Sequence, residues 1–368
     1  MRLLLFSDLH LDTHFSWAGP DAARLRRRNL RTTLTKIVEL SGGLKVDALC
    51  CGGDLYEHER FSPDTGEFLR AIFEGIAPLP VLLAPGNHDW YGPASLYHQV
   101  SWSPNVHVFT ENRFSPVELA DGFTLWGAAH RAPANTPDLL KDFEVDRAGV
   151  NVALFHGSET GAFAWQEEGK VAHAPFSADE ISRAGFAHAL LGHFHRPVDG
   201  PMHTYPGNAD PLEFGEDGDR GAVLLTVHDD GSVKRQHHNV ASSVVADVTL
   251  DIGGSTHTGQ AQEKVRAALA PRSGFVRLTL TGEIAAGVDL DPAEFAAAVV
   301  APHLDALSTR VSRVRAAYDL DALAQEATVR GQFVRDVEAA TDLSEDERRR
   351  VLATGLRALA ALDDLAVR

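Results

Sequence analysis

Cysteine is scarce in this chain, because Cys50 and Cys51 are the only two among 368 residues. They are adjacent within an apolar stretch, which excludes a disulfide framework and makes a small buried hydrophobe the expected role of each. Long apolar runs are missing as well. No run reaches the roughly 18 residues of a membrane span, and the apolar start of the chain is too short for a signal peptide. We therefore expect a folded, soluble protein of the cytoplasm with no membrane partner.

Basic residues are also few relative to acidic ones. The chain has 34 Lys and Arg residues and 51 Asp and Glu residues, which gives a formal net charge of −17. This balance disfavours a protein that coats nucleic acid non-specifically, although it leaves room for a local basic patch. Histidine, by contrast, is abundant, with 18 residues. A chain rich in histidine and poor in cysteine favours nitrogen and oxygen ligands, the set that suits manganese, iron or zinc.

Five apolar runs that read as buried strands are each followed by Asp, Asn or His, and four of these turns contain glycine. Each turn alone is ordinary turn chemistry. In open α/β sheets, however, ligands bind at the carboxyl ends of strands, so the repetition favours a site over coincidence. The runs and their turns are 2–7 with Asp8-Leu9-His10, 48–51 with Gly52-Gly53-Asp54, 80–84 with Gly86-Asn87-His88-Asp89, 150–155 with His156-Gly157, and 187–191 with Gly192-His193-Phe194-His195.

These turns supply more metal ligands than one ion can use, and the number suits two ions that share a bridging carboxylate. The order of the motifs makes Asp54 the bridge. A water held between two ions would be acidified and become a nucleophile near neutral pH. His88, next to a ligand but not needed as one, could supply a proton to the leaving oxygen. The candidate ligands are Asp8, His10, Asp54, Asn87, His156, His193 and His195.

Together these motifs resemble the signature of the calcineurin-like metallophosphoesterases, over residues 1–240. The resemblance implies an α/β (α+β) protein whose β-sandwich is flanked by helices, and it makes His88 the catalytic histidine. It also implies two divalent cations, expected to be manganese with iron or zinc as alternatives. One would be held by Asp8, His10, Asp54 and His195, the other by Asp54, Asn87, His156 and His193.

A narrower resemblance is to the SbcD family, the nuclease subunit of the SbcCD DNA-repair complex. It rests on Tyr205-Pro206-Gly207-Asn208, on the segment 211–216, on the strand 221–225 and on His195-Arg196-Pro197. The ordinary alternative is a tight turn and an edge strand. The resemblance implies a metal-dependent exonuclease or endonuclease that hydrolyses DNA. Glu57 stands near the place where that family carries a further histidine, and His58 follows it.

Residues 21–40 are predicted to form a helix that packs on the sheet, because Leu30, Leu34, Ile37 and Val38 recur at helical spacing. Its first turns are rich in arginine, for which a solvated face is the ordinary explanation and phosphate contact the alternative. The candidate substrate-binding residues are Arg24, Arg27, Arg28, Arg31, His58 and Arg196.

The last third of the chain reads as a small α+β domain (241–318) and a helical tail (319–368). Strands are predicted at 245–250, 275–280 and 310–315, and helices at 260–269 and 292–307. Two helices are predicted in the tail, the second with a Ser344–Glu347 capping box and an apolar stripe of Leu352, Leu356, Leu359 and Leu362.

In SbcD proteins the small domain caps the nuclease and helps bind DNA, and the tail helices dock on the coiled coil of an SMC-like (SbcC-like) ATPase. The alternative is that the stripe folds back on its own domain. The family also suggests a homodimer. Two other functions stay open: a small-molecule phosphodiesterase or phosphatase, for example one that acts on cyclic nucleotides, which the acidic charge and Glu57 favour, and a non-catalytic scaffold, which the complete ligand set disfavours.

Overall fold

The computed structural model describes residues 1–161, 172–285 and 303–359. Contacts divide the chain into two compact units, Met1–Val245 and Ala246–Arg368. Each unit has its own hydrophobic core. In the described part of the chain, no helix combines the length and the apolar composition needed to cross a bilayer.

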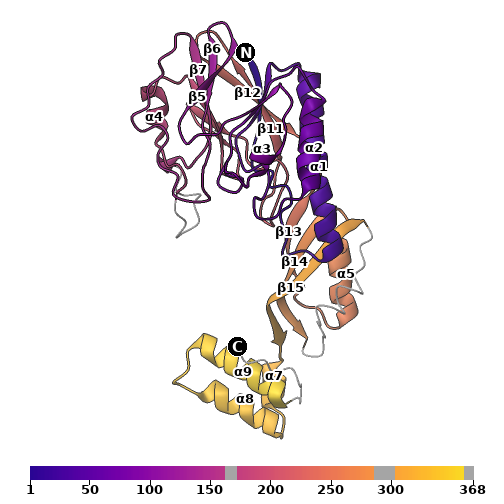
Figure 1. Ribbon diagram of the computed structural model, residues 1–368. Coiled ribbons are helices and arrows are strands. Elements are labelled where there is room, and N and C mark those ends of the chain that lie inside the picture. The colour runs from indigo at the N-terminus through magenta and orange to yellow at the C-terminus, as the bar shows by residue number, and fades with distance from the viewer. Residues whose placement is uncertain (162–171, 286–302, 360–368) are drawn as a thin grey trace. The chain divides into compact units, whose positions relative to one another are not determined.

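The first unit contains two six-stranded sheets (Figure 1). One has strands β1 (Arg2–Phe6), β2 (Ala48–Cys51), β3 (Val81–Leu83), β4 (Val106–Val108), β11 (Gly221–Val227) and β12 (Val233–Asn239), in the order β12-β11-β1-β2-β3-β4. The other has strands β5 (Ser115–Ala120), β6 (Phe123–Gly127), β7 (Val150–His156), β8 (His188–Gly192), β9 (Val198–Asp199) and β10 (His203–Tyr205), in the order β5-β6-β7-β8-β10-β9.

The two sheets pack face to face. Because alternate residues of a strand point to opposite sides, each sheet has an inner and an outer face. Leu3 and Leu5 of β1 share a buried cluster with Val152 and Leu154 of β7. Leu4 of β1 belongs to the cluster on the outer face of its sheet. The inner faces therefore form the sandwich core, and the predicted β-sandwich is confirmed.

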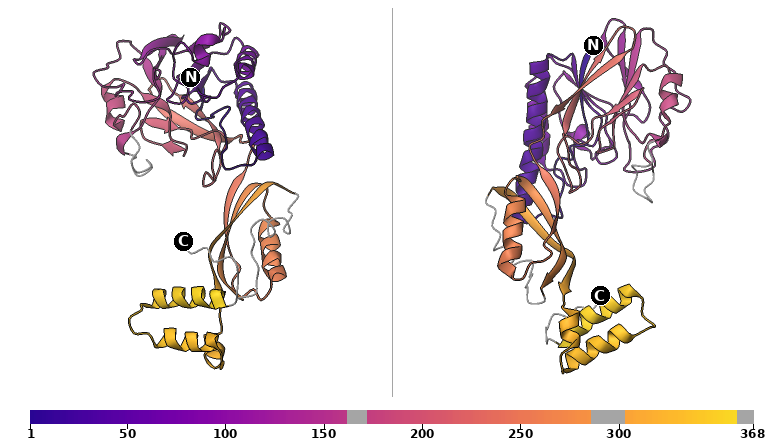
Figure 2. Two further views of the ribbon diagram at one scale, coloured as in Figure 1. Left: turned by 60° about the horizontal axis from the view of Figure 1, so that its bottom comes forward. Right: turned by 180° about the vertical axis from the view of Figure 1, so that it is seen from behind.

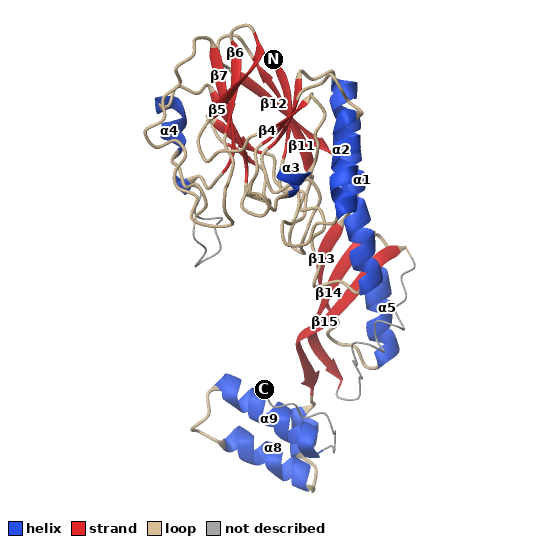
Figure 3. Cartoon of the chain, viewed as in Figure 1, coloured by secondary structure: helices blue, strands red, loops and turns tan. Residues whose placement is uncertain are grey.

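Helices cover the outer faces of the sandwich, as Figures 2 and 3 show for its two sides. Leu30, Leu34 and Ile37 of α1 are buried against the first sheet. Ile181 of α4 is buried against the second. The helices of this unit are α1 (Pro20–Leu44), α2 (Pro63–Glu74), α3 (Leu96–Gln99) and α4 (Ala178–Arg183). The helix predicted at 21–40 thus exists and continues through Gly42 and Gly43, until Lys45 adopts a left-handed conformation.

A fully buried ion pair ties α1 to the segment that follows β10. Arg26 Nη1 donates to Asp210 Oδ1 at 2.9 Å, and both side chains are 0% exposed. The other oxygen of Asp210 accepts hydrogen bonds from Thr33 Oγ1 at 2.7 Å and from the backbone N–H of Ser242 at 2.7 Å. One carboxylate therefore joins three parts of the chain.

We expect Asp210→Ala to lower the free energy of unfolding by about 3–5 kcal/mol, because it leaves the Arg26 guanidinium buried without its counter-charge. Urea unfolding of the full chain measures this. Glu74→Ala is the matched control, since its pair with Arg70 is exposed and should contribute little. An Asp210→Ala midpoint equal to that of Glu74→Ala would contradict the expectation.

The second unit contains a three-stranded sheet of β13 (Val245–Asp251), β14 (Gly274–Ala285) and β15 (Leu304–Ala317), with α5 (Thr258–Leu269) packed on it. The strands and the first helix lie close to their predicted positions. The helix predicted at 292–307 is wrong at its end, because residues 304–307 pair with β14 as the start of β15. Its remaining residues up to 302 lie outside the described residues.

Three helices, not the two predicted, are described after residue 318: α7 (Leu320–Ala324), α8 (Val329–Ala339) and α9 (Glu345–Leu359). The predicted capping box is present, since the Ser344 backbone N–H donates to Glu347 Oε2 at 2.9 Å. Leu352 and Leu356 are buried in one cluster with Val334 of α8. This part of the stripe therefore folds back within the unit, whereas Leu359 is 44% exposed. Leu362 lies outside the described residues.

Candidate metal centre

The candidate donors meet because the strands that carry them are parallel neighbours. β1 pairs in parallel with β2, and β2 with β3, so the turns holding Asp8, Asp54 and Asn87 leave the same edge of the first sheet. β7 and β8 pair in parallel in the second sheet. The two edges touch, since the His193 backbone N–H donates to both oxygens of Asp8 at 3.1 Å.

Glycine allows the turns of the two sheets to approach this closely. Gly53 has a φ of +101°, and a Cβ at this position would lie 2.7 Å from His156 Nδ1. A Cβ at Gly86 would lie 2.3 Å from Asp54 Oδ1. Asp8 and Asp54 themselves have φ values of 51°, a left-handed conformation that is costly for residues other than glycine. Backbone strain of this kind is typical of functional sites.

Asp54 lies at the junction of the cluster. Its Oδ2 is 3.2 Å from His156 Nε2 and 3.7 Å from His10 Nε2. Its Oδ1 accepts the backbone N–H of His88 at 2.8 Å. A single carboxylate thus faces the imidazoles on both sides of it, which is the arrangement that a bridging ligand requires.

On one side of Asp54, three candidate metal-ligand atoms lie close together: His156 Nε2, Asn87 Oδ1 and His193 Nδ1. His156 Nδ1 donates to the Gly52 carbonyl at 2.9 Å, so Nε2 is the ring atom that would bind a cation. This Nε2 lies 3.1 Å from Asn87 Oδ1 and 3.2 Å from His193 Nδ1. The residues are buried or nearly so, and these three atoms share one small space.

On the other side of Asp54, Asp8, His10 and His195 offer ligand atoms that all lie within 4.8 Å of one another. His10 Nδ1 donates to Glu57 Oε1 at 2.8 Å, and His195 Nδ1 donates to Glu216 Oε1 at 2.8 Å. Both imidazoles therefore direct Nε2 inward, with a carboxylate fixing the ring from behind.

The buried carboxylate of Asp54 favours positive charge on the groups around it. Burial alone would raise the pKa of the Asp54 carboxyl, but the neighbouring imidazoles, His156 above all, hold it well below its usual range. Burial opposes a charged His156, yet Asp54 raises the pKa of His156 to about 9. A divalent cation would exploit the same negative potential.

The donor set fits a pair of divalent cations. His10 Nε2 is buried and has no hydrogen-bond partner among the described residues, although it faces a carboxylate. Most buried polar atoms have a hydrogen-bond partner, and a bound ion is one explanation for an atom that lacks one. Imidazole nitrogens combined with carboxylate and amide oxygens suit manganese, iron or zinc.

Asp89 is a buried carboxylate whose contribution the sequence motif did not reveal. It accepts the backbone N–H of Gly86 at 2.6 Å, that of Leu55 at 2.7 Å and the Tyr97 hydroxyl at 2.6 Å. Burial and the nearby Asp54 raise the pKa of Asp89 to about 6. Asp89 thus locks the turns after β2 and β3 together. Its position at the end of the Gly-Asn-His-Asp motif is the one signal that could have pointed to it.

The predicted substrate-binding residues divide into two groups. His58 and Arg196 adjoin the cluster: the His58 N–H donates to the His88 carbonyl at 2.9 Å, its ring stacks on Trp90 at 3.8 Å, and Arg196 follows His195. The other four residues lie on α1, where two of them are held by aspartates rather than by the cluster. These residues are Arg24, paired with Asp21, Arg31, paired with Asp64, and Arg27 and Arg28.

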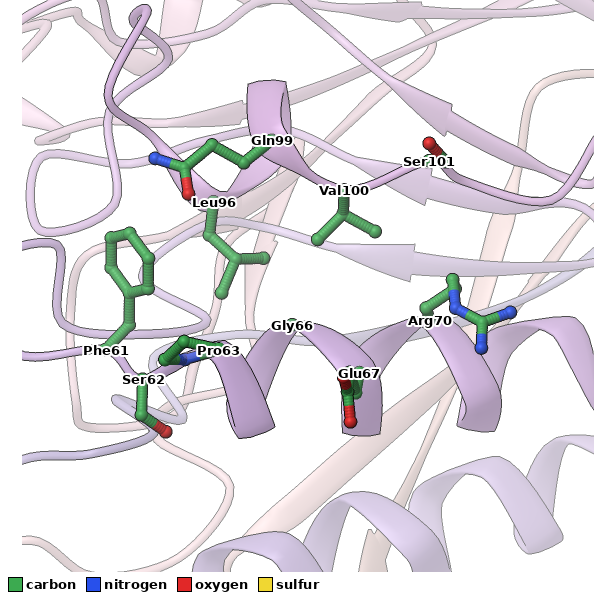
Figure 4. Close-up of a pocket in the computed structure, with 10 residues that line it drawn as sticks. All are labelled: Phe61, Ser62, Pro63, Gly66, Glu67, Arg70, Leu96, Gln99, Val100 and Ser101. Atoms are coloured by element: carbon green, nitrogen blue, oxygen red, sulfur yellow. The ribbon is translucent and has the colours of Figure 1, made fainter.

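A pocket of about 350 Å³ lies between α2 and α3 (Figure 4). Its walls include Phe61, Leu96 and Val100, with the polar side chains of Glu67, Arg70 and Gln99 at its edge. None of the residues that line it belongs to the donor cluster. The pocket is therefore a separate feature of this unit.

Comparison with known proteins gives three findings. A family model described as calcineurin-like phosphoesterase matches residues 1–197. The chain is 25% identical over 262 residues to the uncharacterized metallophosphoesterase YhaO of Bacillus subtilis (strain 168), a match that covers 66% of this chain and 62% of YhaO. The chain thus spans less than two thirds of this relative's length. It is also similar to the crystal structure of TT1561 of Thermus thermophilus, with 18% identity, a TM-score of 0.37, and coverage of 65% of this chain and 98% of that one.

Proposed function

The chain belongs to the calcineurin-like phosphoesterase family, and we propose that within it the protein is a DNA nuclease of SbcD type that depends on two divalent cations. The observation that carries the proposal is Asp54, which faces donor groups on both sides while its Oδ1 holds the backbone of His88. The bridging carboxylate and the candidate acid are thereby fixed to one another.

Two groups of residues would hold the cations. When bound, the pair supplies Lewis-acid stabilisation of the phosphoryl charge and activation of the attacking water. The chain's own residues fix the geometry, because Gly52, Glu57 and Glu216 hold the far nitrogens of three of the imidazoles. The first group is Asp8, His10, Asp54 and His195, and the second is Asp54, Asn87, His156 and His193.

His88 has the surroundings of a general acid. It is 46% exposed at the side chain, so a substrate can reach it. Burial disfavours its charged form, but the hydrogen bond to Glu57 and the charge of Asp54 raise the pKa of His88 to about 9. In the metal-free chain it is therefore protonated at neutral pH, and this is the form that can donate a proton to the leaving oxygen of a phosphodiester.

The segment that resembles SbcD supports the narrower proposal, because its residues hold parts of the cluster. The Tyr205 hydroxyl donates to the Gly157 carbonyl at 2.7 Å, directly after His156. Asn208 Nδ2 donates to Glu216 Oε2 at 2.6 Å, and Glu216 orients His195. This segment therefore does more than close a turn at the edge of the sheet.

The test is cleavage of end-labelled linear and hairpin DNA by the purified chain, with and without Mn²⁺, and with His88→Ala as the control. We expect Mn²⁺-dependent cleavage that the variant loses. No cleavage of either DNA, together with hydrolysis of a small phosphodiester such as a cyclic nucleotide, would contradict the nuclease proposal and favour the small-molecule alternative.

The partners are a further part of the proposal. Resemblance to SbcD and the exposure of Leu359 on α9 support docking of an SMC-like ATPase on the C-terminal helices, and the same resemblance supports a homodimer. Removing the chain beyond Thr341 should abolish capture of such an ATPase. Undiminished capture would contradict this assignment.

A further inference from the structure

Glu57 lies between the candidate ligand His10 and the candidate acid His88, and its two carboxylate oxygens contact one imidazole each. Oε1 is 2.8 Å from His10 Nδ1, and Oε2 is 3.2 Å from His88 Nδ1. The two rings meet edge to face with centroids 4.7 Å apart. We propose that Glu57 is a positioning residue that sets the tautomer of His10 and the orientation of both histidines, so that metal binding and leaving-group protonation depend on one carboxylate. The inference rests on the proposed function for the role of His88.

The backbone keeps this carboxylate in place. The Glu57 N–H donates to the Leu11 carbonyl at 2.9 Å, and the Glu57 carbonyl accepts the N–H groups of Arg60 and Phe61 at 3.0 Å each. The side chain is 19% exposed. Glu57 is therefore anchored to the turn after β1, which carries His10, and is not a mobile surface glutamate.

The contacts of Glu57 with the two imidazoles require two hydrogen-bond acceptors, one for each ring. Each imidazole presents Nδ1–H to one oxygen, which leaves Nε2 as the working atom of each ring. For His10, this Nε2 is the buried atom without a partner that faces Asp54 at 3.7 Å. For His88, it is the nitrogen that remains available to a leaving oxygen. A glutamine has a single acceptor oxygen, and its amide N–H₂ cannot accept from the second imidazole.

Glu57→Gln keeps the size of the side chain and removes one of the two acceptors. Glu59→Gln is the matched control, because this neighbouring glutamate is exposed. Calorimetric titration of the metal-free chain with Mn²⁺ measures binding without reference to activity. At saturating Mn²⁺, kcat and KM are compared for two phosphodiesters, one with a p-nitrophenyl and one with an alkyl leaving group. Imidazole ¹H–¹⁵N NMR of the metal-free chain reports the tautomer of His10 and the Nδ1–H hydrogen bonds of both histidines.

In Glu57→Gln, we expect one Mn²⁺ to bind about 10–100-fold more weakly, as for other substitutions behind a metal-ligating histidine. We also expect kcat to fall more for the alkyl ester than for the p-nitrophenyl ester, with KM unchanged. Glu59→Gln should behave as the wild-type chain does. A change in Mn²⁺ affinity alone, or in the kcat ratio alone, would overturn the shared role.

Failure of this inference can be told apart from failure of the proposed function. If the wild-type chain hydrolyses no phosphodiester, the proposed function fails, while the Mn²⁺ titration and the imidazole NMR spectra still report on Glu57. A His10 tautomer and Nδ1–H hydrogen bonds of both rings that are identical in the wild-type chain and in Glu57→Gln would then overturn the inference by themselves.

Discussion

Asp54→Asn should leave the chain with one bound Mn²⁺ or fewer and should reduce phosphodiester hydrolysis on the order of a thousandfold or more. The reason is the position of Oδ2, which lies 3.2 Å from His156 Nε2 and 3.7 Å from His10 Nε2 and so belongs to both donor groups. An asparagine is neutral, and its one oxygen cannot replace both Oδ2 and the Oδ1 that accepts the His88 N–H, so its amide N–H₂ would face either a cation or that N–H. Losing one cation removes several kcal/mol of charge stabilisation, which corresponds to a rate loss of this size.

Elemental analysis of the Mn²⁺-loaded chain, combined with initial rates, measures both effects. Asp179→Asn is a suitable control, since this aspartate pairs with Arg183 on the surface of α4. It should retain two ions and the wild-type rate. Two ions bound to Asp54→Asn, with turnover near the wild-type value, would show that Asp54 is not the bridging ligand.

The positions of the donors could be predicted because they depend on local patterns. A short apolar run followed by glycine and a polar residue marks a strand end. The structure places five donors at the ends of β1, β2, β3, β7 and β8 or in the turns that follow within four residues: Asp8, Asp54, Asn87, His156 and His193. Parallel pairing then brings these ends to one edge. The cluster therefore follows from the alternation of strands and turns, while the roles of its members as ligands remain predictions.

The residues that orient the donors could not be predicted, because their contacts are set by the tertiary fold. Glu216 reaches His195 across 21 residues, and Glu57 reaches His10 across 47. Neither glutamate belongs to a periodic pattern. The same limit explains residues 304–307, which are apolar enough for a helix but become part of β15 because β14 offers a partner strand.

The arginines at the start of α1 show the converse case, in which one local pattern has several causes. Arg26 stands among the basic residues at the start of α1, yet it is buried and neutralised by Asp210. Arg31 pairs with Asp64 and packs over Phe68. An arginine-rich helix turn therefore combines structural ion pairs with solvated charge, and only the fold separates the two.

His88→Gln should lower kcat for DNA or for an alkyl phosphodiester by a factor of about 10²–10⁴, the range expected for loss of a general acid. An alkyl oxygen is a poor leaving group and needs the proton of His88. A p-nitrophenyl leaving group is stable as an anion, so the same substitution should change its kcat far less. Mn²⁺ stoichiometry should stay at the wild-type value, because the His88 side chain is not among the seven candidate ligands and only its backbone N–H contacts Asp54.

The ratio of the two rates is what separates the acid from other roles of this histidine. His98→Gln is the matched control, since this exposed imidazole contacts Tyr91 and has no part in the cluster. Equal losses on both substrates would contradict proton donation, because a residue that only binds the phosphoryl group acts alike on good and poor leaving groups. A loss confined to the poor leaving group would assign the proton transfer to His88, since the p-nitrophenyl ester keeps every other step of the reaction.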